Sequence, residues 1–399
     1  MTNTKSLSVL ISGASIAGPA LASWLHAYGH RVTVVERAPQ LRQGGQAVDF
    51  RGDAHLTMLR KMGILTSIQA RQTSPGPLNL IDAAGRTQVS LPADFTGGDV
   101  EILRGDLAEL LYERTRHGAE YVFGDSITSL TETASGVDVT FERGAPRTFD
   151  LVVGADGLHS NVRRLAFGPE KEFVKDTGYH VAIFSAPDHL GLGHAGLLYN
   201  EPGRGISVGS HGPGTASVLC VFAGGDLTFD RRDTEQQKGL VARAFAGMGW
   251  EATRFVEAMW QAEDFYFDAI SLVQMPRYTN GRIALLGDAG YGATCGGMGA
   301  GMAMISSYVL AGELASAAGD HRVAFAEYER QLKDYAKACQ RVASGAGSFL
   351  APKTARGIGL RNSAHKILTL PMFGNLLKNL TTKAANSITL KEYPVPVRG

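Results

Sequence analysis

A chain of 399 residues is longer than most single compact cores, so we expect two domains. Its net charge of +1 predicts no broad attraction to nucleic acid or to an anionic membrane. The three cysteines, Cys220, Cys295 and Cys339, are too few and too widely spaced for a disulfide framework or a paired-cysteine metal site. We therefore expect a cytoplasmic protein that holds no metal.

The start of the chain predicts a strand–helix–strand unit. Residues 7–12 (LSVLIS) form a strand-length apolar run that ends at Gly13, 17–28 predict a helix, and 31–36 (RVTVVE) predict a second strand. Such a unit requires a parallel sheet, because its crossover is right-handed. The next predicted elements are helices at 53–62 and 105–116 and strands within 121–140 and at 149–153.

The middle of the chain has a different pattern, in which β-rich runs separated by glycine extend from 179 to 223. This pattern predicts a second, sheet-based domain inserted into the first. The remaining predicted elements are helices at 234–247 and 251–261, strands at 265–272 and 282–286, and helices at 298–317, 321–343 and 365–385. We expect one domain from 1–75, 97–170 and 276–345, a second from 76–96 and 171–275, and a C-terminal helical segment at 346–399.

Residues 289–312 carry no formal charge and are numerous enough to span a membrane. However, Asp288 and Glu313 bracket this run, and its first half is rich in glycine. A buried loop that leads into a buried helix explains the composition better, so we expect no membrane span.

The first of three glycine motifs is Gly13-Ala-Ser15-Ile-Ala17-Gly18, which fits G-x-G-x-x-G with Ser15 in place of the second glycine. Gly13 permits a tight turn after the strand, and Gly18 lets the helix pack closely on it. The helix N-terminus then offers free N–H groups to a pyrophosphate. Glu36 ends the second strand, where a carboxylate accepts ribose hydroxyls and repels a 2′-phosphate. These residues predict a site for FAD or NAD rather than NADP.

The second motif is residues 150–157 (DLVVGADG). A strand that ends in this way places Asp156 at the edge of a parallel sheet, where ligands bind. A simple Asp-Gly turn explains the motif equally well.

The third motif is residues 281–289 (GRIALLGDA), in which another apolar strand ends in Gly287 and Asp288. A glycine-rich loop with Gly299, Ala300 and Gly301 follows and opens a helix. Asp288 can accept a ribityl or ribose hydroxyl, and the loop N–H groups suit a phosphate or a flavin edge. The alternative is a flexible loop with an N-capping aspartate.

In this order the motifs resemble those of the class A flavoprotein aromatic hydroxylases, the para-hydroxybenzoate hydroxylase-like monooxygenases, over roughly residues 6–345. That group includes tetracycline-inactivating and polyketide monooxygenases. Residues 44–49 (GGQAVD) resemble the family segment beside the isoalloxazine, and 101–111 (EILRGDLAELL) resemble its R-x-x-L-x-x-x-L helix. The resemblance implies an α/β fold with a Rossmann-type FAD-binding domain, a parallel sheet, an inserted β-sheet substrate domain and a C-terminal helix.

The resemblance also implies how FAD is held. The first motif holds the pyrophosphate, Glu36 the adenosine ribose, and Arg104 and Asp288 flank the ribityl-diphosphate. Asp156 belongs to a motif associated with both FAD and NAD(P)H. The expected cofactor-binding residues are Gly13, Ser15, Ala17, Gly18, Glu36, Arg37, Arg42, Gln46, Arg104, Asp156, Gly287, Asp288, Gly299, Ala300 and Gly301.

The chain departs from the family pattern after Asp288. The family usually has G-D-A-A-H followed by one or two prolines, whereas residues 287–295 here are GDAGYGATC. The wall beside the flavin is therefore expected to differ in shape.

The expected activity is hydroxylation of an aromatic or polycyclic, polyketide- or antibiotic-like small molecule. By the resemblance, NADPH or NADH reduces FAD, which reacts with dioxygen to give a C4a-hydroperoxide that transfers a hydroxyl group. The cofactor carries the chemistry, so no catalytic side chain is predicted. The alternatives are a FAD-dependent reductase or dehydrogenase without oxygen insertion and a non-catalytic flavin-fold protein. We expect a monomer or a weak homodimer.

Candidates for substrate contact come from the inserted sheet and from the loop after Asp288. Strand aromatics more often pack in a core, and a lone histidine is more often a structural group. An apolar, largely uncharged cavity is expected, which favours a flat hydrophobic aromatic substrate. The candidates are His180, Phe184, Tyr199, Phe222 and Thr294, with His211 and Cys295 also considered.

Overall fold

The computed structural model describes residues 6–42, 44–212, 214–225, 227–370 and 382–393. A six-stranded sheet, here the parallel sheet, has the order β17-β18-β11-β1-β2-β7, with an antiparallel edge at β17. Its strands are β1 (Ser8–Ser12), β2 (Arg31–Glu36), β7 (Ala119–Phe123), β11 (Leu151–Gly154), β17 (Thr279–Asn280) and β18 (Ile283–Leu285). The α/β fold with a parallel sheet is as predicted.

The central strands β1, β11 and β18 contain consecutive apolar residues because both faces of the parallel sheet are covered. Val9 and Ile11 of β1 pack with the helices on one face, while Leu10 packs on the other face with a three-stranded sheet and α6. The helical face carries α1 (Ala17–Ala27), α5 (Arg104–Thr115), α11 (Gly299–Ser316) and α12 (His321–Ala343). The opposite face carries β8 (Ile127–Glu132), β9 (Val137–Phe141), β10 (Arg147–Phe149) and α6 (Asn161–Ala166).

A two-stranded sheet packs beside these helices. Its pairing places the segment that follows Gly45 next to the residues that lead into α5. Its strands are β3 (Ala47–Phe50) and β6 (Val100–Leu103). The short helices of this region are α2 (Gly52–Met62), α3 (Leu65–Gln69) and α4 (Ala93–Gly97), and α7 (Glu170–Phe173) and α10 (Asp288–Tyr291) occur later in the chain.

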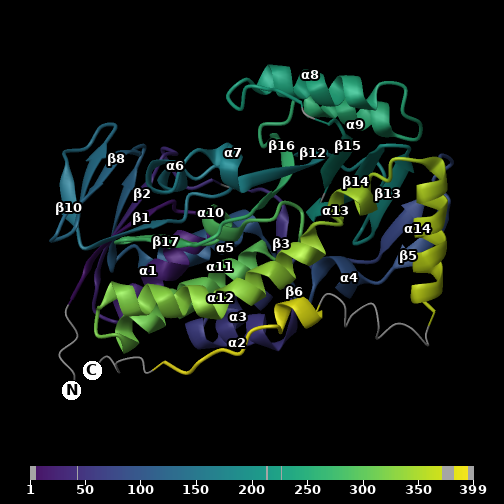
Figure 1. Cartoon of the computed structure of the whole chain (residues 1–399). Helices are drawn as coiled ribbons and strands as arrows, with labels where there is room; N and C mark the ends of the chain where they lie inside the picture. Colours follow the sequence, from purple (N-terminus) through teal and green to yellow (C-terminus); the bar gives the residue numbers. More distant parts are fainter. Residues whose placement is uncertain (1–5, 43, 213, 226, 371–381, 394–399) are drawn as a thin grey trace.

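A seven-stranded sheet forms the second large sheet of the fold, with the strand order β16-β12-β15-β14-β13-β4-β5. Helices α8 and α9 cover one of its faces, and the other face turns toward the parallel sheet (Figure 1). Its strands are β4 (Leu78–Ile81), β5 (Thr87–Leu91), β12 (Val174–Pro187), β13 (Gly196–Glu201), β14 (Arg204–Gly212), β15 (Thr215–Ala223) and β16 (Tyr266–Val273). The two covering helices are α8 (Thr234–Phe245) and α9 (Ala252–Met259).

The C-terminal segment contacts both sheet systems. Helix α13 (Ala346–Leu350) packs on β12, β14 and β15, and α14 (Ala355–Leu368) packs on β5 and β13. Residues 382–393 return to α11, where Tyr393 packs on Gly312. The predicted helix at 365–385 is wrong at its start, because Thr354 caps a helix that begins at Ala355. Part of that prediction, 371–381, lies outside the described residues.

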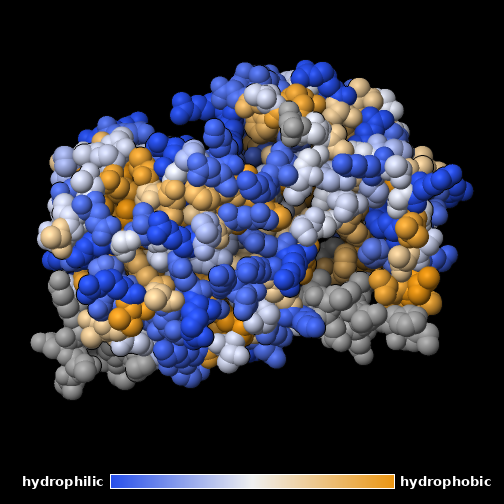
Figure 2. All heavy atoms as spheres, in the orientation of Figure 1, coloured by the Kyte–Doolittle hydropathy of each residue, from blue (hydrophilic) through white to orange (hydrophobic). Residues whose placement is uncertain are grey.

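Within the described part of the chain, no helix is long and apolar enough to cross a membrane. The uncharged run is divided between α10, a loop and α11, and α11 is buried between α1 and α12. The visible face carries hydrophilic side chains throughout, with smaller hydrophobic groups between them (Figure 2).

Candidate functional site

The three glycine motifs meet at the carboxyl edge of the parallel sheet. The Gly13 N–H donates to the Val35 carbonyl at 2.8 Å, and the Ala155 N–H donates to the Ser12 carbonyl at 2.8 Å. Strand β18 lies next to β11, so the Leu286 N–H reaches the Gly154 carbonyl. Ligands of α/β sheets bind at this edge.

Gly13 and Gly18 form a cradle at the start of α1. Gly13 has φ of +109°, and a Cβ there would lie 2.4 Å from the Ala155 carbonyl oxygen. A Cβ at Gly18 would lie 1.9 Å from the Gly13 carbonyl oxygen. No side chain caps α1, so its first N–H groups face the edge and can bind an anion. The third motif joins this cradle, because a Cβ at Gly287 would lie 3.2 Å from Ala17.

Arg104 links the first motif to the segment beside the predicted flavin. Its guanidinium donates to Ser15 Oγ at 2.9 Å, and its N–H donates to the Gln46 carbonyl at 3.1 Å. Burial and the neighbouring Arg42 lower the pKa of Arg104, while Asp288 opposes this shift. Arg104 nevertheless stays a cation at neutral pH, since an arginine is not deprotonated in a protein.

Asp288 is the first residue of α10, and its side chain is exposed to solvent even though other parts of the protein lie around it. Burial raises the pKa of its carboxyl, and Arg104 opposes that rise. A side chain that is exposed and yet enclosed in this way lies in a cleft. Gly299 is adjacent, since a Cβ there would lie 3.6 Å from Asp288 Oδ1. The carboxylate is thus available to hydroxyl groups of a ligand.

Glu36 holds the backbone around the first turn. Its two carboxylate oxygens accept hydrogen bonds from the Ala14 N–H at 2.9 Å and the Ala38 N–H at 2.8 Å. A carboxylate has about four acceptor positions, so it can still accept ribose hydroxyls. Arg37, Arg42 and Gln46 are exposed.

Asp156 holds the N-terminus of α6, whose N-cap is Ser160. Its carboxylate accepts from the Asn161 N–H at 2.9 Å, the Val162 N–H at 3.1 Å and the Ser160 hydroxyl. Arg163 of the same helix is fully buried and donates to the Ala289 carbonyl at 2.9 Å, which fastens the second motif to the third. Asp156 therefore has a structural role at the edge where the motifs meet.

The glycine-rich loop lies on a buried polar group that the sequence analysis missed. Asp49 and Arg51 form an ion pair beneath Gly297. Burial raises the pKa of Asp49 to about 6, and Arg51 opposes the rise. His55 lies under Gly301 and hydrogen-bonds the Tyr335 hydroxyl at 2.8 Å. Burial lowers the pKa of His55 to about 4, so this histidine is neutral at pH 7. Their spacing of two and four residues carried no recognisable sequence signal.

The unusual segment after Asp288 is well anchored. Tyr291 is buried, and its hydroxyl accepts from the Gly287 N–H at 3.0 Å and contacts the Tyr328 hydroxyl at 3.2 Å. Thr294 donates its N–H to the Ser271 carbonyl at 3.0 Å, which ties the loop to β16. Cys295 has φ of +60°, an uncommon value for a side chain other than glycine.

The structure shows where the four strand residues of the expected substrate set lie. His180, Phe184, Tyr199 and Phe222 are buried in the core that α8 and α9 cover. His180 stacks between Phe222 and Phe267 at centroid distances of 5.6 and 5.9 Å. Successive strand residues face opposite sides, so these side chains point away from the parallel sheet. The side chain of His211 lies outside the described part of the chain.

The other face of the seven-stranded sheet is the one that turns toward the parallel sheet. The carboxyl edge of the parallel sheet, where the three glycine motifs meet, is called the glycine edge below. The row across this face of the seven-stranded sheet consists of Ile183, its partner Leu219 and that residue's partner Ser207. Leu219 and Ser207 are half-buried, as are Ser185 and Ser217 in the next row. The packing of Cys295 against this face brings the loop after Asp288 to it. This part of the face therefore carries small hydroxyl and aliphatic side chains.

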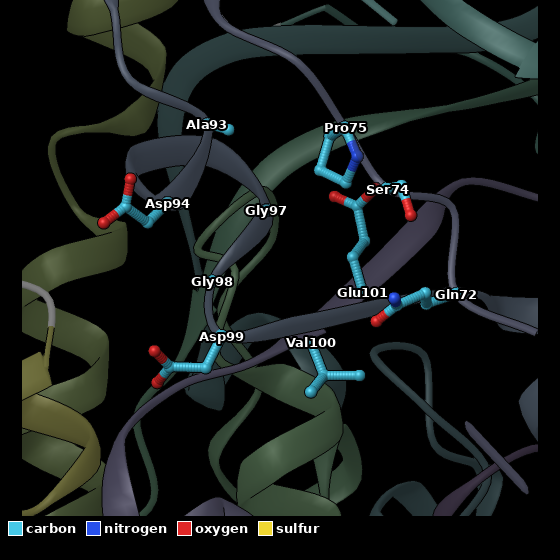
Figure 3. Close-up of a pocket in the computed structure, with 10 residues that line it drawn as sticks. All are labelled: Gln72, Ser74, Pro75, Ala93, Asp94, Gly97, Gly98, Asp99, Val100 and Glu101. Atoms are coloured by element: carbon cyan, nitrogen blue, oxygen red, sulfur yellow. The ribbon is translucent and has the colours of Figure 1, made fainter. Parts of the chain in front are cut away.

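A separate cavity of about 250 Å³ lies at the α4–β6 connection (Figure 3). Asp94, Asp99 and Glu101 contribute carboxylates to its wall, with Glu101 directed toward Ser74. Three carboxylates would repel the phosphates of a dinucleotide, so this cavity does not suit the cofactor. Among the described residues, no group of acidic, histidine and cysteine side chains is placed to hold a metal ion.

His159, two residues after Gly157, ties the two sheet systems together. Its Nε2 lies 2.7 Å from Asp268 of β16, and its Nδ1 lies 3.1 Å from Glu170. Burial alone would lower the pKa of His159, but the hydrogen bonds to Asp268 and Glu170 raise it overall. Hydrogen bonds with His159 and Arg231 lower the pKa of Glu170 to about 2, against the effect of burial.

We expect His159→Gln to destabilise the fold in a pH-dependent way. The pKa of His159 in the folded protein lies above its ordinary value of 6.5. The stability that the charged His159 contributes is therefore fully present below pH 6.5 and is lost as pH rises through the folded pKa. The side chain is 28% exposed, so about 1 kcal/mol is expected. Urea unfolding at pH 5.5 and 8.5 measures the free energy of unfolding of the variant and of the wild-type protein. An equal loss of stability at both pH values would contradict a charged His159 in the folded protein.

The glycine edge fits FAD in its chemistry. A cradle without side chains and the open N-terminus of an 11-residue helix suit a pyrophosphate. Carboxylates at Glu36 and Asp288 suit the hydroxyls of ribose and ribityl groups, and Arg104 supplies a cation between them.

Comparison with known proteins gives the same assignment. The sequence matches the FAD binding domain family over residues 6–347. A flavin-dependent monooxygenase from an unknown prokaryotic organism is 37% identical, over 98% of this chain and 100% of that protein. An uncharacterised Mycobacterium tuberculosis protein is 44% identical, over 84% of this chain and 92% of its own length.

The crystal structure of tetracycline destructase Tet(55) has a TM-score of 0.84 to this chain at 36% identity. The superposition covers 98% of this chain and 100% of that one. The family match covers most of the chain, and the edge geometry suits the same cofactor. The chain therefore belongs to the class A flavin-dependent monooxygenases, oxidoreductases that bind FAD and use NAD(P)H.

Proposed function

We propose that FAD lies across the carboxyl edge of the parallel sheet, with its pyrophosphate at the N-terminus of α1. This proposal is supported chiefly by the cradle at the start of α1. There the backbone occupies the space that side chains at positions 13 and 18 would need, so only glycine fits. The proposed cofactor-binding residues are Gly13, Ser15, Ala17, Gly18, Glu36, Arg37, Arg42, Gln46, Arg104, Asp156, Gly287, Asp288, Gly299, Ala300 and Gly301.

The proposed substrate is a flat, hydrophobic aromatic or polycyclic molecule that lies between the loop after Asp288 and the seven-stranded sheet. In this proposal Ile183, Leu219 and Ser207, which share one row of the sheet, form one wall of the substrate site. The likeness to a tetracycline destructase at 36% identity supports a polycyclic substrate. In this proposal residues 1–75, 97–170 and 276–345 form the FAD-binding domain, 76–96 and 171–275 the substrate domain, and 346–399 the C-terminal segment.

When bound and reduced by NADH or NADPH, FAD supplies the activation of dioxygen and the insertion of one oxygen atom into the substrate. The protein's own residues orient the substrate and exclude water. Aliphatic side chains at Ile183 and Leu219 pack against a flat ring system, and serine hydroxyls beside them bind its polar groups. The N-terminus of α11 presents partial positive charge to the proposed flavin position and favours negative charge there.

The proposal is tested on purified protein with polycyclic phenols, tetracycline among them. We expect a bound-flavin absorbance spectrum, NADH or NADPH oxidation that a ligand stimulates, and a product that contains one additional oxygen atom. Stimulated oxidation without an oxygenated product would instead favour a FAD-dependent reductase or dehydrogenase. A protein that binds no flavin would contradict the cofactor assignment.

A further inference from the structure

Helix α14 presents a stripe of apolar side chains to solvent, at one end of the molecule (Figure 1). Leu360 is 74% exposed and Ile367 is 56% exposed, and their spacing of seven residues places them on one face of the helix. Leu370, just beyond the end of the helix, is 48% exposed. Three of the six exposed large hydrophobic side chains in the described ranges therefore lie in this one segment. Single exposed hydrophobic residues are ordinary, but a stripe along one helix indicates an interaction surface.

The opposite face of α14, which packs on β5 and β13, carries polar side chains. Arg361 donates to the Phe349 carbonyl at 2.6 Å, and its guanidinium lies 5.4 Å from the centre of the Phe349 ring. The ring of His365 lies 6.1 Å from that of Phe95 and 5.2 Å from that of Phe349. A helix at a protein surface normally turns its apolar face inward and its polar face to water. In α14 this arrangement is inverted, and none of its residues is buried.

Basic side chains flank the apolar stripe. Arg356 lies four residues before Leu360, Lys366 is next to Ile367, and both basic side chains are exposed. Residues 335–391 contain no aspartate or glutamate but nine lysines and arginines. The whole chain has a net charge of only +1, so positive charge is concentrated in this part of the sequence. The stripe and its flanks therefore suit a partner that is both apolar and anionic.

A surface of anionic lipid fits these features better than another protein does. The inner face of α14 is held on the sheet, so only its convex outer ridge is available and the helix cannot enter a protein groove. A second copy of this chain would bring two basic flanks together, and like charges repel. Lipid headgroups supply the negative charge, and the acyl boundary beneath them accepts the apolar side chains of a helix that lies in the interface.

We propose that α14 docks this protein on the surface of an anionic membrane. Leu360 and Ile367 enter the boundary between headgroups and acyl chains, while Arg356 and Lys366 bind lipid phosphates. The docking is peripheral, and the inference goes beyond the proposed function without depending on it. It brings the seven-stranded sheet to a layer in which flat hydrophobic molecules dissolve.

The test uses the full chain with FAD bound and sucrose-loaded vesicles, which carry bound protein down on centrifugation. One set of vesicles is phosphatidylcholine alone, and the other contains about one third phosphatidylglycerol. We expect the wild-type protein to bind the anionic vesicles about tenfold more tightly than the neutral ones. About 1 M salt should remove most of this preference, because the Debye length then falls to about 3 Å.

The apolar stripe is tested by Leu360→Gln combined with Ile367→Gln. Glutamine keeps a favourable helix propensity, so the helix should persist. This double variant should bind anionic vesicles about tenfold more weakly, since two apolar side chains no longer leave water. Val323→Gln is the matched control, because Val323 is 60% exposed but lies on α12. It should bind as the wild-type protein does.

The basic flank is tested by Arg356→Gln combined with Lys366→Gln. The matched control is Lys333→Gln combined with Lys337→Gln, which removes two exposed positive charges from α12. Both double variants lower the net charge by the same amount, so they differ only in position. The α14 pair should weaken binding to anionic vesicles about tenfold at low salt, and the α12 pair should have little effect.

Several results would overturn the proposal. The wild-type protein could fail to sediment with anionic vesicles, or the stripe variant could bind them as tightly as the wild-type protein does. An equal effect of the α12 and α14 charge pairs would show attraction without a defined surface. Wild-type self-association that the stripe variant abolishes, without vesicle binding, would show that a second copy of this chain covers the stripe. None of these results bears on the proposed function, because no measurement uses a substrate or a reduced nicotinamide.

Discussion

Gly18→Ala is expected to abolish FAD binding and to destabilise the protein by about 3 kcal/mol, at the upper end of overpacking effects. The added Cβ would lie 1.9 Å from the Gly13 carbonyl oxygen and 3.3 Å from the Ile11 side chain. Backbone cannot rotate away as a flexible side chain can, so α1 must move from β1. That movement displaces the helix N–H groups from the edge. Flavin content after gel filtration and urea unfolding measure the two effects.

Gly359→Ala is the matched control, because Gly359 is also helical and has open space around its Cα. This change should be neutral or slightly stabilising, since alanine favours a helix over glycine by about 1 kcal/mol. A Gly18→Ala protein that keeps full flavin content and wild-type stability would contradict the cradle at the start of α1.

Asp288→Ala should weaken FAD binding by about 30-fold, which corresponds to about 2 kcal/mol for hydrogen bonds to a charged group. Asp288 is exposed in the cleft, so its removal leaves core packing unchanged and the fold should persist. The change also leaves Arg104 without its neighbouring carboxylate. Fluorescence titration of the apoprotein with FAD measures the dissociation constant.

Asp334→Ala provides the comparison for Asp288, since Asp334 is exposed on α12. Its FAD dissociation constant should equal that of the parent protein. Asp288→Asn should fall between the two, because the amide keeps one acceptor oxygen but loses the charge. An Asp288→Ala protein with unchanged FAD affinity would refute the assignment of this carboxylate to the ribityl group.

The first strand–helix–strand unit was predictable because its signals are local. Strands at 7–12 and 31–36 and a helix at 17–28 were predicted, and β1, β2 and α1 begin and end within one residue of these limits. Glycine at a turn and an acidic residue at a strand end both follow from short-range geometry. The pairing of distant strands has no local signal: β11 pairs with β1 from more than 130 residues away, and β18 pairs with β11.

The direction in which the residues of β12 face was not predictable, for a physical reason. Strand β12 is buried on both faces, so its apolar residues do not alternate with polar ones. His180 and Phe184 therefore gave no sign that they face α8 and α9, while Ile183 faces the parallel sheet. The relevant signal is the register between strands, which a single sequence does not contain. The contact between His159 and Asp268 also joins residues more than 100 positions apart.

The C-terminal helix shows how a local rule was overridden. Gly357 and Gly359 argue against a helix at 355–368, since glycine is a poor helix former. Thr354 nevertheless caps α14 by accepting from the Gly357 N–H at 3.0 Å, and α14 packs on β5 and β13. Tertiary contacts and a side-chain cap together outweigh the propensity.

Oxygen-isotope incorporation tests the central claim most directly. The FAD-loaded protein is incubated under labelled dioxygen with NADH or NADPH and with the polycyclic phenol that best stimulates oxidation, and the product is weighed by mass spectrometry. We predict that one atom of the product comes from labelled dioxygen. Consumption of the reduced nicotinamide with the label found only in hydrogen peroxide or water would contradict hydroxylation of this class of substrate.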